Sequence, residues 1–255
     1  MDNLVYKIEK IVRHCGEIVL NSKNDSLDIE YKDGAANIVT RYDKMIQEIL
    51  KNELLKILPE AIFIGEEEDL HNEISTSGYT YIVDPIDGTM NFSRGLSLSA
   101  ISVALLKDGI PYIGVCYNPY LDEMFIAQKN MGAYLNNKQI KVSDKNLNEG
   151  LLLIGSSPYS KELHKKSIEL LYKYSTIATD FRRVGAAVLD LCNIACGRAE
   201  LYIELKLQPW DYAAGTLIVQ EAGGKVTDIN REEMKFNKPS SIVASNNKED
   251  YFKYM

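Results

Sequence analysis

The stretch YTYIVDPIDGTMNF (residues 79–92) determines the plan of this 255-residue chain. Its first half is a run of apolar and aromatic residues, which is typical of a buried strand. Asp84, Pro85 and Asp87 follow, and these residue types are typical of turns. The pattern predicts a strand that ends at Asp84, then a rigid turn that carries two carboxylates. Gly88 and Thr89 are expected to begin a helix, and Gly88 would let the backbone approach a ligand closely.

The composition places the chain among ordinary globular enzymes. Hydrophobic residues make up 45% of it and charged residues 25%, which are typical values. A net charge of −7 argues against a nucleic-acid polymer or a polybasic membrane anchor as partner. No apolar stretch approaches the roughly 18 residues that a membrane helix needs, and no secretory signal is visible. We therefore expect a cytoplasmic protein that does not bind membranes, with its four cysteines as structural thiols.

On both sides of residues 79–92, the hydrophobic pattern predicts a mixture of helices and short strands. Helices are predicted at residues 3–21, 41–58, 159–174, 186–197 and 211–222, with a short one at the C-terminus. Strands are predicted at 61–65, 79–84 and 97–106, then as an antiparallel meander, and further at 175–185 and 199–204. The polar stretch at 144–150 marks the expected boundary between subdomains 1–145 and 146–255. The predicted fold class is α+β, or mixed α/β.

Three segments place acidic residues directly after an apolar strand or at the start of a helix. They are FIGEEED (63–69), IVDPIDGT (82–89) and PWDYAAG (209–215). Carboxylates that are buried together repel one another unless cations neutralise them. Oxygen ligands without His or Cys favour a hard ion, Mg²⁺ first, which often shares its shell with a phosphate. The sequence therefore predicts a site for Mg²⁺ and phosphate, with phosphate at the free amides of the helix start.

Taken together, these motifs resemble those of the inositol monophosphatase family, which belongs to a wider group of Mg²⁺-dependent, lithium-sensitive phosphomonoesterases. The matching pieces are GEE (65–67), DPIDGTMNF (84–92), PWDYAAG (209–215) and EAGG (221–224). Their order and spacing fit over nearly the whole chain. The resemblance implies a layered αβαβα sandwich and the Mg²⁺-dependent hydrolysis of a sugar or polyol phosphate, inositol monophosphate first. It also implies a homodimer.

The resemblance further assigns roles to single residues. The metal ligands, for two to three Mg²⁺ ions, would be Glu66, Asp84, the Ile86 carbonyl, Asp87 and Asp211. The catalytic residues would be Asp43, Thr89 and Glu66, with Thr89 and Asp43 positioning or deprotonating the attacking water. Gly88 and Thr89 would bind the phosphate. Lys32 would belong to a mobile loop that closes over the site.

The segment RRVGAA (182–187) matches the part of the family that contacts the leaving alcohol. The resemblance implies substrate contacts from Gly185, Ala186, Ala187 and Glu204, together with Asp87 and Asp211. For Gly185 to Ala187, a plain strand-to-helix turn is an open alternative. Met90, Ala186 and Tyr212 differ from residues common in the family, which argues against a strict preference for inositol. Arg182 and Arg183 are either solvated charges or ion-pair partners at a strand end, or they contact a second phosphate.

Two kinds of alternative remain open. Within the same superfamily, the chain could be a fructose 1,6-bisphosphatase or a 3′(2′),5′-bisphosphate nucleotidase or NADP phosphatase. In a different class, it could be a regulatory binding protein that keeps the fold without turnover. The complete set of carboxylates argues against that second class, because a protein without activity would tolerate the loss of one.

Overall fold

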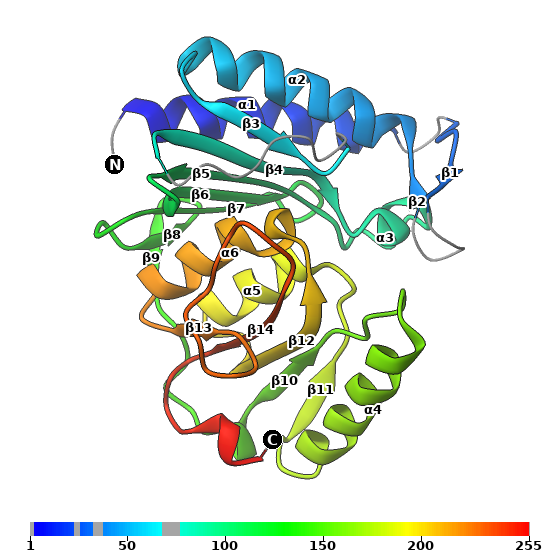
Figure 1. The fold of residues 1–255 in the computed structure, drawn as a ribbon, viewed down its shortest axis with the longest axis vertical. Helices are drawn as coiled ribbons and strands as arrows, with labels where there is room; N and C mark the ends of the chain where they lie inside the picture. Colours follow the sequence, from blue (N-terminus) through cyan, green and yellow to red (C-terminus); the bar gives the residue numbers. More distant parts are fainter. Residues whose placement is uncertain (1–2, 23–25, 33–37, 68–76, 255) are drawn as a thin grey trace.

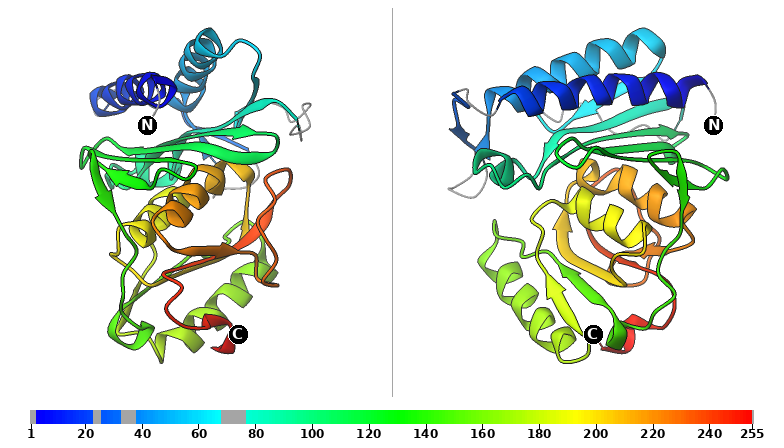
Figure 2. Two further views of the ribbon diagram at one scale, coloured as in Figure 1. Left: turned by 90° about the vertical axis from the view of Figure 1, so that its left-hand side faces the viewer. Right: turned by 180° about the vertical axis from the view of Figure 1, so that it is seen from behind.

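The protein folds into five alternating layers of helix and sheet, seen in the computed structural model (Figure 1). The structure describes residues 3–22, 26–32, 38–67 and 77–254. From one side to the other, the layers are a helix pair, a seven-stranded sheet, a second helix pair, a five-stranded sheet and a last helix (Figure 2). The αβαβα sandwich expected from the sequence is therefore confirmed.

The seven-stranded sheet is antiparallel except at one edge. Its order is β3-β4-β5-β6-β7-β8-β9, and only the β3–β4 pair in it is parallel. The predicted antiparallel meander is thus confirmed. The strands are β3 (Ile62–Gly65), β4 (Tyr79–Asp87), β5 (Ala100–Lys107), β6 (Ile110–Asn118), β7 (Glu123–Gln128), β8 (Ala133–Leu135) and β9 (Lys138–Ile140).

The five-stranded sheet has the order β11-β10-β12-β14-β13. Strand β10 pairs in parallel with both of its neighbours, and the β12–β14 and β13–β14 pairs are antiparallel. A separate short ladder joins β1 (Glu30–Tyr31) to β2 (Ile38–Val39). The strands of the five-stranded sheet are β10 (Leu151–Ile154), β11 (Asp180–Arg182), β12 (Leu201–Leu207), β13 (Lys225–Thr227) and β14 (Ser240–Ser245).

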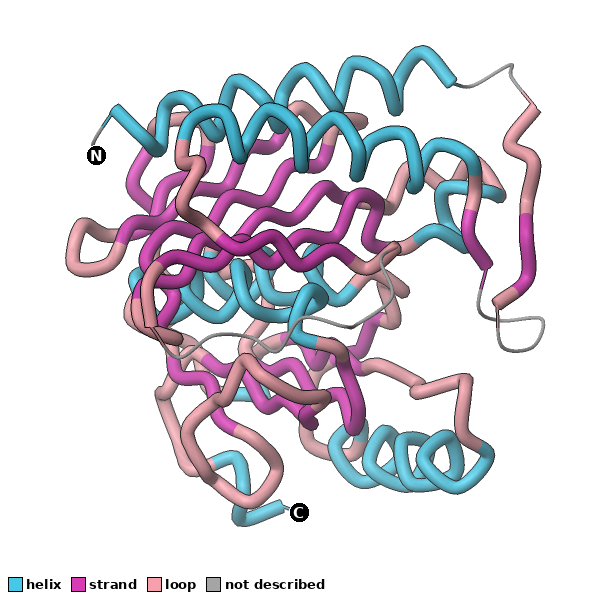
Figure 3. The backbone as a smooth tube through the Cα atoms, turned by 45° about the horizontal axis from the view of Figure 1, so that its top comes forward, coloured by secondary structure: helices cyan, strands magenta, loops and turns pink. Residues whose placement is uncertain are grey.

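Helices cover both faces of the large sheet. Helices α1 (Asn3–Asn21) and α2 (Arg41–Ile57) run across its outer face (Figure 3), and α5 (Ala187–Ala195) and α6 (Pro209–Glu221) lie between the two sheets. Helix α4 (Lys161–Ser175) and the 3₁₀ turn η3 (Tyr251–Tyr254) cover the outer face of the small sheet. A short helix, α3 (Thr89–Ser93), follows β4, and the 3₁₀ turn η2 (Leu147–Glu149) precedes β10.

Strand β5 shows why the large sheet sits in the middle of the molecule. Side chains of a strand alternate between its two faces. Ile101, Val103 and Leu105 are buried in the core under α1 and α2, and Ala104 and Leu106 are buried in the core against α5 and α6. A strand buried on both faces reads as a continuous apolar run, as this one does. The two sheets therefore share one of the hydrophobic cores.

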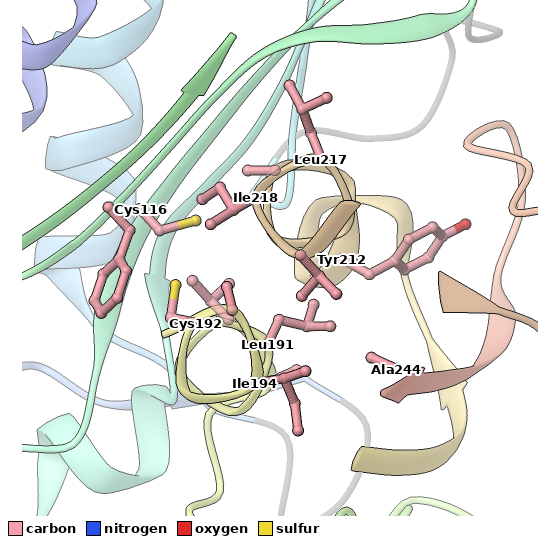
Figure 4. Close-up of a cluster of buried hydrophobic side chains, with 14 of the residues drawn as sticks. Cys116, Leu191, Cys192, Ile194, Tyr212, Leu217, Ile218 and Ala244 are labelled. Carbon is pink, nitrogen blue, oxygen red and sulfur yellow. The ribbon is translucent and has the colours of Figure 1, made fainter. Parts of the chain in front are cut away.

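Helix α6 approaches the sheet very closely at β6. A Cβ atom at Gly114 would lie 2.7 Å from the carbonyl oxygen of Ala214, so only a glycine leaves room for the α6 backbone. Leu217 and Ile218 of α6 are buried with Leu191 and Cys192 of α5 in this layer (Figure 4). This tight packing fixes the N-terminal ends of both helices relative to β4, which matters for the site below.

The structure corrects three boundaries predicted from the sequence. Strand β4 continues to Asp87 rather than ending at Asp84. The predicted strand at 175–185 is a strand only over Asp180–Arg182, because α4 extends to Ser175 and a turn follows it. The C-terminal helix is a single 3₁₀ turn.

The division into subdomains 1–145 and 146–255 stays a prediction. The four cysteines are free thiols: Cys15, Cys116 and Cys192 are buried, and Cys196 is half-buried. Across the described residues, none of the helices is long and apolar enough to cross a membrane.

Candidate active site

A β-bulge at the end of β4 shapes the first part of the site. Asp84 pairs with Ser102 and Asp87 with Ala100, so β4 uses one residue more than β5 over this stretch. Proline has no N–H to donate to the ladder, and an extra residue bends a strand and re-aims its side chains. The Ile86 amide donates a hydrogen bond to Asp84 Oδ1 at 3.0 Å. The predicted rigid turn is therefore a bulged strand end.

Three carboxylates from two elements converge at this strand end. Asp84 and Asp87 come from β4, and Asp211 comes from the first turn of α6. Each offers an oxygen atom, and these oxygens lie within 4.8 Å of one another. Asp84 and Asp87 are buried, and Asp211 is partly buried. The sequence prediction that these three side chains meet is confirmed as geometry.

Backbone amides at the starts of α5 and α6 hold two of these carboxylates, Asp87 and Asp211. Val188 N at the start of α5 donates to Asp87 Oδ2 at 2.7 Å. Gln208 N at the start of α6 donates to Asp211 Oδ2 at 2.7 Å. Carboxylates are stabilised by the free amides and the positive end of the dipole at such positions. Both side chains are therefore fixed in place by the main chain.

The pKa values show that the cluster carries more negative charge than its surroundings offset. Burial raises the pKa of Asp87 to about 7. Burial, followed by the charge of Glu66, raises the pKa values of Asp84 and Asp211 well above the ordinary value. The main charges that act on Asp84 and Asp211 are all those of other carboxylates. A buried, all-oxygen donor set with this excess charge fits a hard divalent cation such as Mg²⁺.

Glu66 stands beside this group rather than in it. Its amide donates to the Val83 carbonyl at 3.1 Å, which sets it next to Asp84. Its charge raises the pKa values of Asp84, Asp87 and Asp211, whereas Glu67 is not among the main causes for any of them. This difference supports Glu66 rather than Glu67 as the side chain that faces the cluster.

Lys32 sits over these two glutamates. Its Nζ lies 3.3 Å from Glu66 Oε1 and 2.7 Å from Glu67 Oε1. Burial alone would lower the pKa of Lys32, but the charges of Glu66 and Glu67 outweigh it and raise that pKa. Most of the predicted mobile loop, residues 33–37, lies outside the described residues. Lys32 itself is therefore placed at the edge of the carboxylate cluster.

Asp43 and Thr89 meet as the sequence predicted. Thr89 Oγ1 lies 3.1 Å from Asp43 Oδ1 and 3.1 Å from the Ile86 carbonyl oxygen. The other oxygen, Asp43 Oδ2, accepts hydrogen bonds from Thr40 N and Thr40 Oγ1 in a capping box at the start of α2. Burial raises the pKa of Asp43 to about 7. This side chain is thus fully buried, fixed and able to exchange a proton near neutral pH.

The start of α3 packs directly on the segment before α5. Gly88 has a positive φ of 83°, and a Cβ atom there would lie 3.0 Å from the Ala186 Cβ. Asn91 Nδ2 donates to the Val184 carbonyl at 2.9 Å. The motif DPIDGTMNF therefore forms a hydrogen bond to Val184 that was not predicted from the sequence. This contact brings Gly185 and Ala186 beside Gly88. No local pattern points to this contact, because 93 residues separate Asn91 from Val184.

Glu204 completes the floor of the site on β12. Tyr202 Oη donates to Glu204 Oε2 at 2.7 Å, and Ser157 N donates to Glu204 Oε1 at 3.3 Å. Burial raises the Glu204 pKa, although both hydrogen bonds oppose that shift. The loop at residues 155–160 therefore belongs to the site, which sequence reasoning missed because 47 residues separate Ser157 from Glu204.

The two arginines before Gly185 point in different directions. Arg182 Nη1 pairs with Asp180 Oδ2 at 2.6 Å on its own strand, which favours the ion-pair alternative for this residue. Arg183 Nε donates to Ser156 Oγ at 2.9 Å. The charge of Arg183 also lowers the pKa of Glu204. Arg183 therefore faces the site, and Arg182 does not.

Two further residues near the site, Tyr212 and Asp190, are buried. Tyr212 is fully buried, and its hydroxyl lies within hydrogen-bond distance of the carbonyl oxygens of Lys235 and Lys238 and donates to one of them. Its difference from the family therefore serves the core rather than the leaving alcohol. Asp190 lies inside α5 with its Oδ1 buried and without a hydrogen-bond partner. Burial, then the charges of Glu204 and Asp87, raise the pKa of Asp190 well above the ordinary value. Sequence reasoning gave no role to Asp190.

The Inositol monophosphatase family model matches residues 1–254 of the chain. This chain belongs to that family. A curated relative, the inositol-1-monophosphatase of Bacillus subtilis, is 32% identical over 238 residues, which cover 93% of this chain and 90% of the relative. The resemblance read from the sequence motifs is therefore confirmed.

Solved structures of family members agree with the fold. The extragenic suppressor protein suhB of Bartonella henselae aligns with a TM-score of 0.89 at 32% identity, covering 97% of this chain and 95% of that one. Inositol monophosphatase II of Staphylococcus aureus, in a structure with bound inositol monophosphate, aligns with a TM-score of 0.81 at 26% identity, covering 95% of this chain and 89% of that one. The same protein has a structure with bound 2′AMP. Family membership indicates a phosphatase.

Proposed function

We propose that this protein is a Mg²⁺-dependent phosphatase that hydrolyses a sugar or polyol phosphate monoester, with inositol monophosphate as the first candidate. The single observation that carries the proposal is the cluster of Asp84, Asp87 and Asp211. Three partly or fully buried carboxylates within 4.8 Å of one another are stable only when positive charge is added. Family membership and the inositol monophosphate bound by the S. aureus relative support the substrate class.

In this proposal the protein holds two to three Mg²⁺ ions through oxygen atoms alone. The ligands are Glu66, Asp84, the Ile86 carbonyl, Asp87 and Asp211. When bound, Mg²⁺ polarises the phosphate, lowers the pKa of a water and offsets charge on the leaving oxygen. The fixed positions of Asp87 and Asp211 at two helix starts support this assignment, because phosphoryl transfer depends on positioning and charge neutralisation.

Thr89 and Asp43 act on the attacking water. A hydroxyl has one proton to donate, so Thr89 donates either to Asp43 or to the Ile86 carbonyl. When it donates to Asp43, its lone pairs are free to accept a proton from water. Asp43, whose pKa is raised to about 7, then receives the proton that Thr89 passes on. This route needs the ionised form of Asp43 at the start of each turnover.

The phosphate and the leaving alcohol meet residues from two neighbouring segments. The amides of Gly88 and Thr89 face the phosphate, in line with the close packing of Gly88 against Ala186. The leaving alcohol meets carboxylates from Asp87, Glu204 and Asp211 as hydroxyl acceptors, together with the backbone of Gly185 to Ala187. Because the amides of Ala187 and Val188 already donate to Asp87, Gly185 and Ala186 are the main backbone candidates.

The proposal is tested by phosphate release with Mg²⁺ across four esters. The panel is inositol 1-phosphate, fructose 1,6-bisphosphate, NADP and adenosine 3′,5′-bisphosphate, and the highest kcat/KM is expected for inositol 1-phosphate. An Asp84→Asn protein purified in parallel controls for contaminating phosphatase. Release from none of the four, or equal release from the Asp84→Asn protein, would contradict the proposal.

A bisphosphatase of the same superfamily is the second candidate, as a fructose 1,6-bisphosphatase or a 3′(2′),5′-bisphosphate nucleotidase or NADP phosphatase. The observation that favours it is Arg183, which faces the site and reaches the loop at Ser156. A guanidinium binds phosphate oxygens well because it offers two parallel donors. In the panel above, a higher kcat/KM for a bisphosphate than for inositol 1-phosphate would favour this candidate.

The proposal also covers the assembly, the location and the inhibition of the protein. We propose a homodimer in the cytoplasm, a closing motion of the loop that begins at Lys32, and sensitivity to lithium. The complete set of Asp43, Glu66, Thr89 and the three aspartates argues against a regulatory binding protein without turnover. Size-exclusion chromatography with light scattering tests the dimer, and a monomer at micromolar concentration would contradict it.

A further inference from the structure

The side chain of Asn91 on α3 joins two segments that lie far apart in the sequence. Its Nδ2 atom donates to the Leu98 carbonyl at 2.8 Å and to the Val184 carbonyl at 2.9 Å. Both partners are carbonyl oxygens, which only accept hydrogen bonds, so the nitrogen of the side-chain amide faces them. That nitrogen carries two protons, and the two contacts use both. Because Asn91 is 7% exposed, loss of its amide would leave two carbonyls without a bond that water readily replaces.

The first of these segments is a strained loop between α3 and β5. Ser97 has a φ of 57°, in the left-handed region that residues other than glycine rarely adopt. Such a conformation persists only where surrounding contacts hold it. On one side of Ser97, the Leu96 amide donates to the Asn91 carbonyl at 3.0 Å, and on the other side the Leu98 carbonyl accepts from the Asn91 side chain. Asn91 therefore holds the strained residue from both sides.

The second segment carries the backbone that the proposed function places against the leaving alcohol. A Cβ atom at Gly185, which has a φ of 81°, would lie 3.3 Å from Asn91 Nδ2. A Cβ atom at Gly88, the N-cap of α3, would lie 3.0 Å from the Ala186 Cβ and 3.4 Å from the Gly185 carbonyl oxygen. The Asn91 amide thus lies where the start of α3 packs on the segment before α5.

The phosphate end and the alcohol end of the proposed site are held by different contacts. At the phosphate end, Thr89 Oγ1 lies 3.1 Å from Asp43 Oδ1 and 3.1 Å from the Ile86 carbonyl oxygen. The start of α3 is therefore fixed to α2 and β4 by contacts that do not involve Asn91. At the alcohol end, the segment before α5 is bound to α3 through the Asn91 amide. A change at Asn91 acts first on the alcohol end.

We propose that Asn91 is a positioning residue that sets the distance between the phosphate-binding start of α3 and the alcohol-binding backbone at Gly185 and Ala186. The inference rests on the proposed phosphatase function and adds to it a residue that acts through the main chain of two other segments. Loss of the Asn91 amide then weakens the binding of an ester whose alcohol reaches Gly185. The binding of free phosphate stays nearly unchanged.

The test compares the KM for inositol 1-phosphate with the inhibition constant of inorganic phosphate, both measured with Mg²⁺. Asn91→Ala is expected to raise this KM about tenfold, the effect of losing one or two buried hydrogen bonds. The inhibition constant should change by less than about twofold, because a contact used only by the alcohol is not used by phosphate. Asn91→Asp keeps the shape but places an oxygen against two carbonyls, so it should raise KM at least as much.

Asn246→Ala is the matched control for the loss of a buried amide. Asn246 is also buried, and its Nδ2 donates to the carbonyl of Lys145, distant in the sequence, at 2.8 Å. Its backbone amide donates to the Glu200 carbonyl, before the start of β12. Asn246→Ala should therefore lower Tm as Asn91→Ala does, but it should leave both the KM and the inhibition constant unchanged.

Two results would overturn the inference while leaving the proposed function intact. One is a KM within about twofold of that of the unaltered protein in both Asn91→Ala and Asn91→Asp, since a lost positioning contact must appear in KM. The other is an equal rise of the KM and of the inhibition constant, which would show that Asn91 supports the whole site. If Asn91→Ala does not fold, Asn91→Ser, which keeps one donor, replaces it in the same comparison. Release of no phosphate from inositol 1-phosphate by the unaltered protein would overturn the proposed function and the inference with it.

Discussion

The candidate active site has a metal side, formed by Asp84, Asp87 and Asp211, and an alcohol side around Glu204. Their side chains are held in different ways. On the metal side, Asp87 and Asp211 are each held by a backbone amide at a helix start, and Asp84 is held by the Ile86 amide in the bulge. On the alcohol side, the group beside Glu204 is the exposed side chain of Arg183, which directly follows the end of β11 at Arg182. The contrast teaches that the main chain holds the carboxylates of the metal side rigidly. In the proposed function, the choice of alcohol then depends on exposed side chains that can be exchanged without disturbing the fold.

The largest effect is expected when one proposed metal ligand is removed from the metal side. Asp87→Asn should lower kcat for inositol 1-phosphate by about a thousandfold, because one charged ligand is lost where charge develops in the reaction. The Asn side chain keeps the shape and the oxygen that accepts from Val188. Thermal unfolding followed by circular dichroism should therefore stay cooperative. Residual activity above about a tenth of the original would contradict the assignment of Asp87, since loss of even one transition-state donor costs more.

The proton route gives the next effect. Activity should rise with pH along an acid limb, because Asp43 must be ionised, and the limb should lie at or below pH 7, since bound Mg²⁺ lowers a carboxyl pKa that burial alone raises to about 7. Asp43→Asn should lower kcat about a hundredfold and remove this limb. The pH profile of kcat checks both. Thr89→Ser keeps the hydroxyl and should retain the limb, and an Asp43→Asn profile that keeps it would refute the route.

A second-phosphate contact on the alcohol side can be tested by substituting two neighbouring arginines, Arg183 and Arg182, separately. Arg183→Ala should raise KM for a bisphosphate substrate about tenfold, because a charge-assisted hydrogen bond is lost, and should leave a monophosphate nearly unchanged. Arg182→Ala should change neither, since Arg182 pairs with Asp180. KM values for fructose 1,6-bisphosphate and inositol 1-phosphate decide the matter. Equal effects of Arg183→Ala on both substrates would remove the second-phosphate contact.

The smallest expected effect concerns the thermal stability of the protein and the buried side chain of Asp190. Asp190 has a raised pKa in the folded protein, so above its ordinary pKa the folded state binds more protons than the unfolded state. Stability then falls as pH rises. Asp190→Asn removes this loss and should raise Tm by about 2–4 °C at pH 8, and by less at pH 5. Thermal scans at both pH values check it.

Asp180 provides the control for that measurement. Hydrogen bonds from Arg182 and the Phe181 amide lower its pKa, and it is exposed. Asp180→Asn should therefore not raise Tm at pH 8. A gain for Asp190→Asn that is the same at pH 5 and pH 8 would show that charge is not its cause.

Much of the metal side could be predicted from the sequence, and little of the alcohol side could. Asp84, Asp87 and Thr89 stand in one local motif, and Asp211 follows a proline at a helix start, so short patterns revealed them. The bulge at Pro85 was read as a turn, since proline and glycine favour both. Strand β4 extends past Asp84 because β5 continues to pair with it as far as Asp87.

The missed residues depend on contacts between distant parts of the chain. Ser157 meets Glu204 across 47 residues, and Asn91 meets Val184 across 93. Neither pair has a spacing or a residue type that predicts the contact. Asp190 gains its importance from the carboxylates of Glu204 and Asp87 that packing places near it. Periodicity shows that a helix has a buried face, but it does not show which charge lies behind that face.

The central claim is that the carboxylate cluster holds the Mg²⁺ on which phosphate release depends. The most direct measurement is the initial rate of phosphate release from inositol 1-phosphate by protein stripped with EDTA, followed as Mg²⁺ is returned. We expect no release without the ion and a saturable recovery with it, and no recovery in Asp87→Asn at the same Mg²⁺ concentrations. Release at the full rate in EDTA would contradict the account.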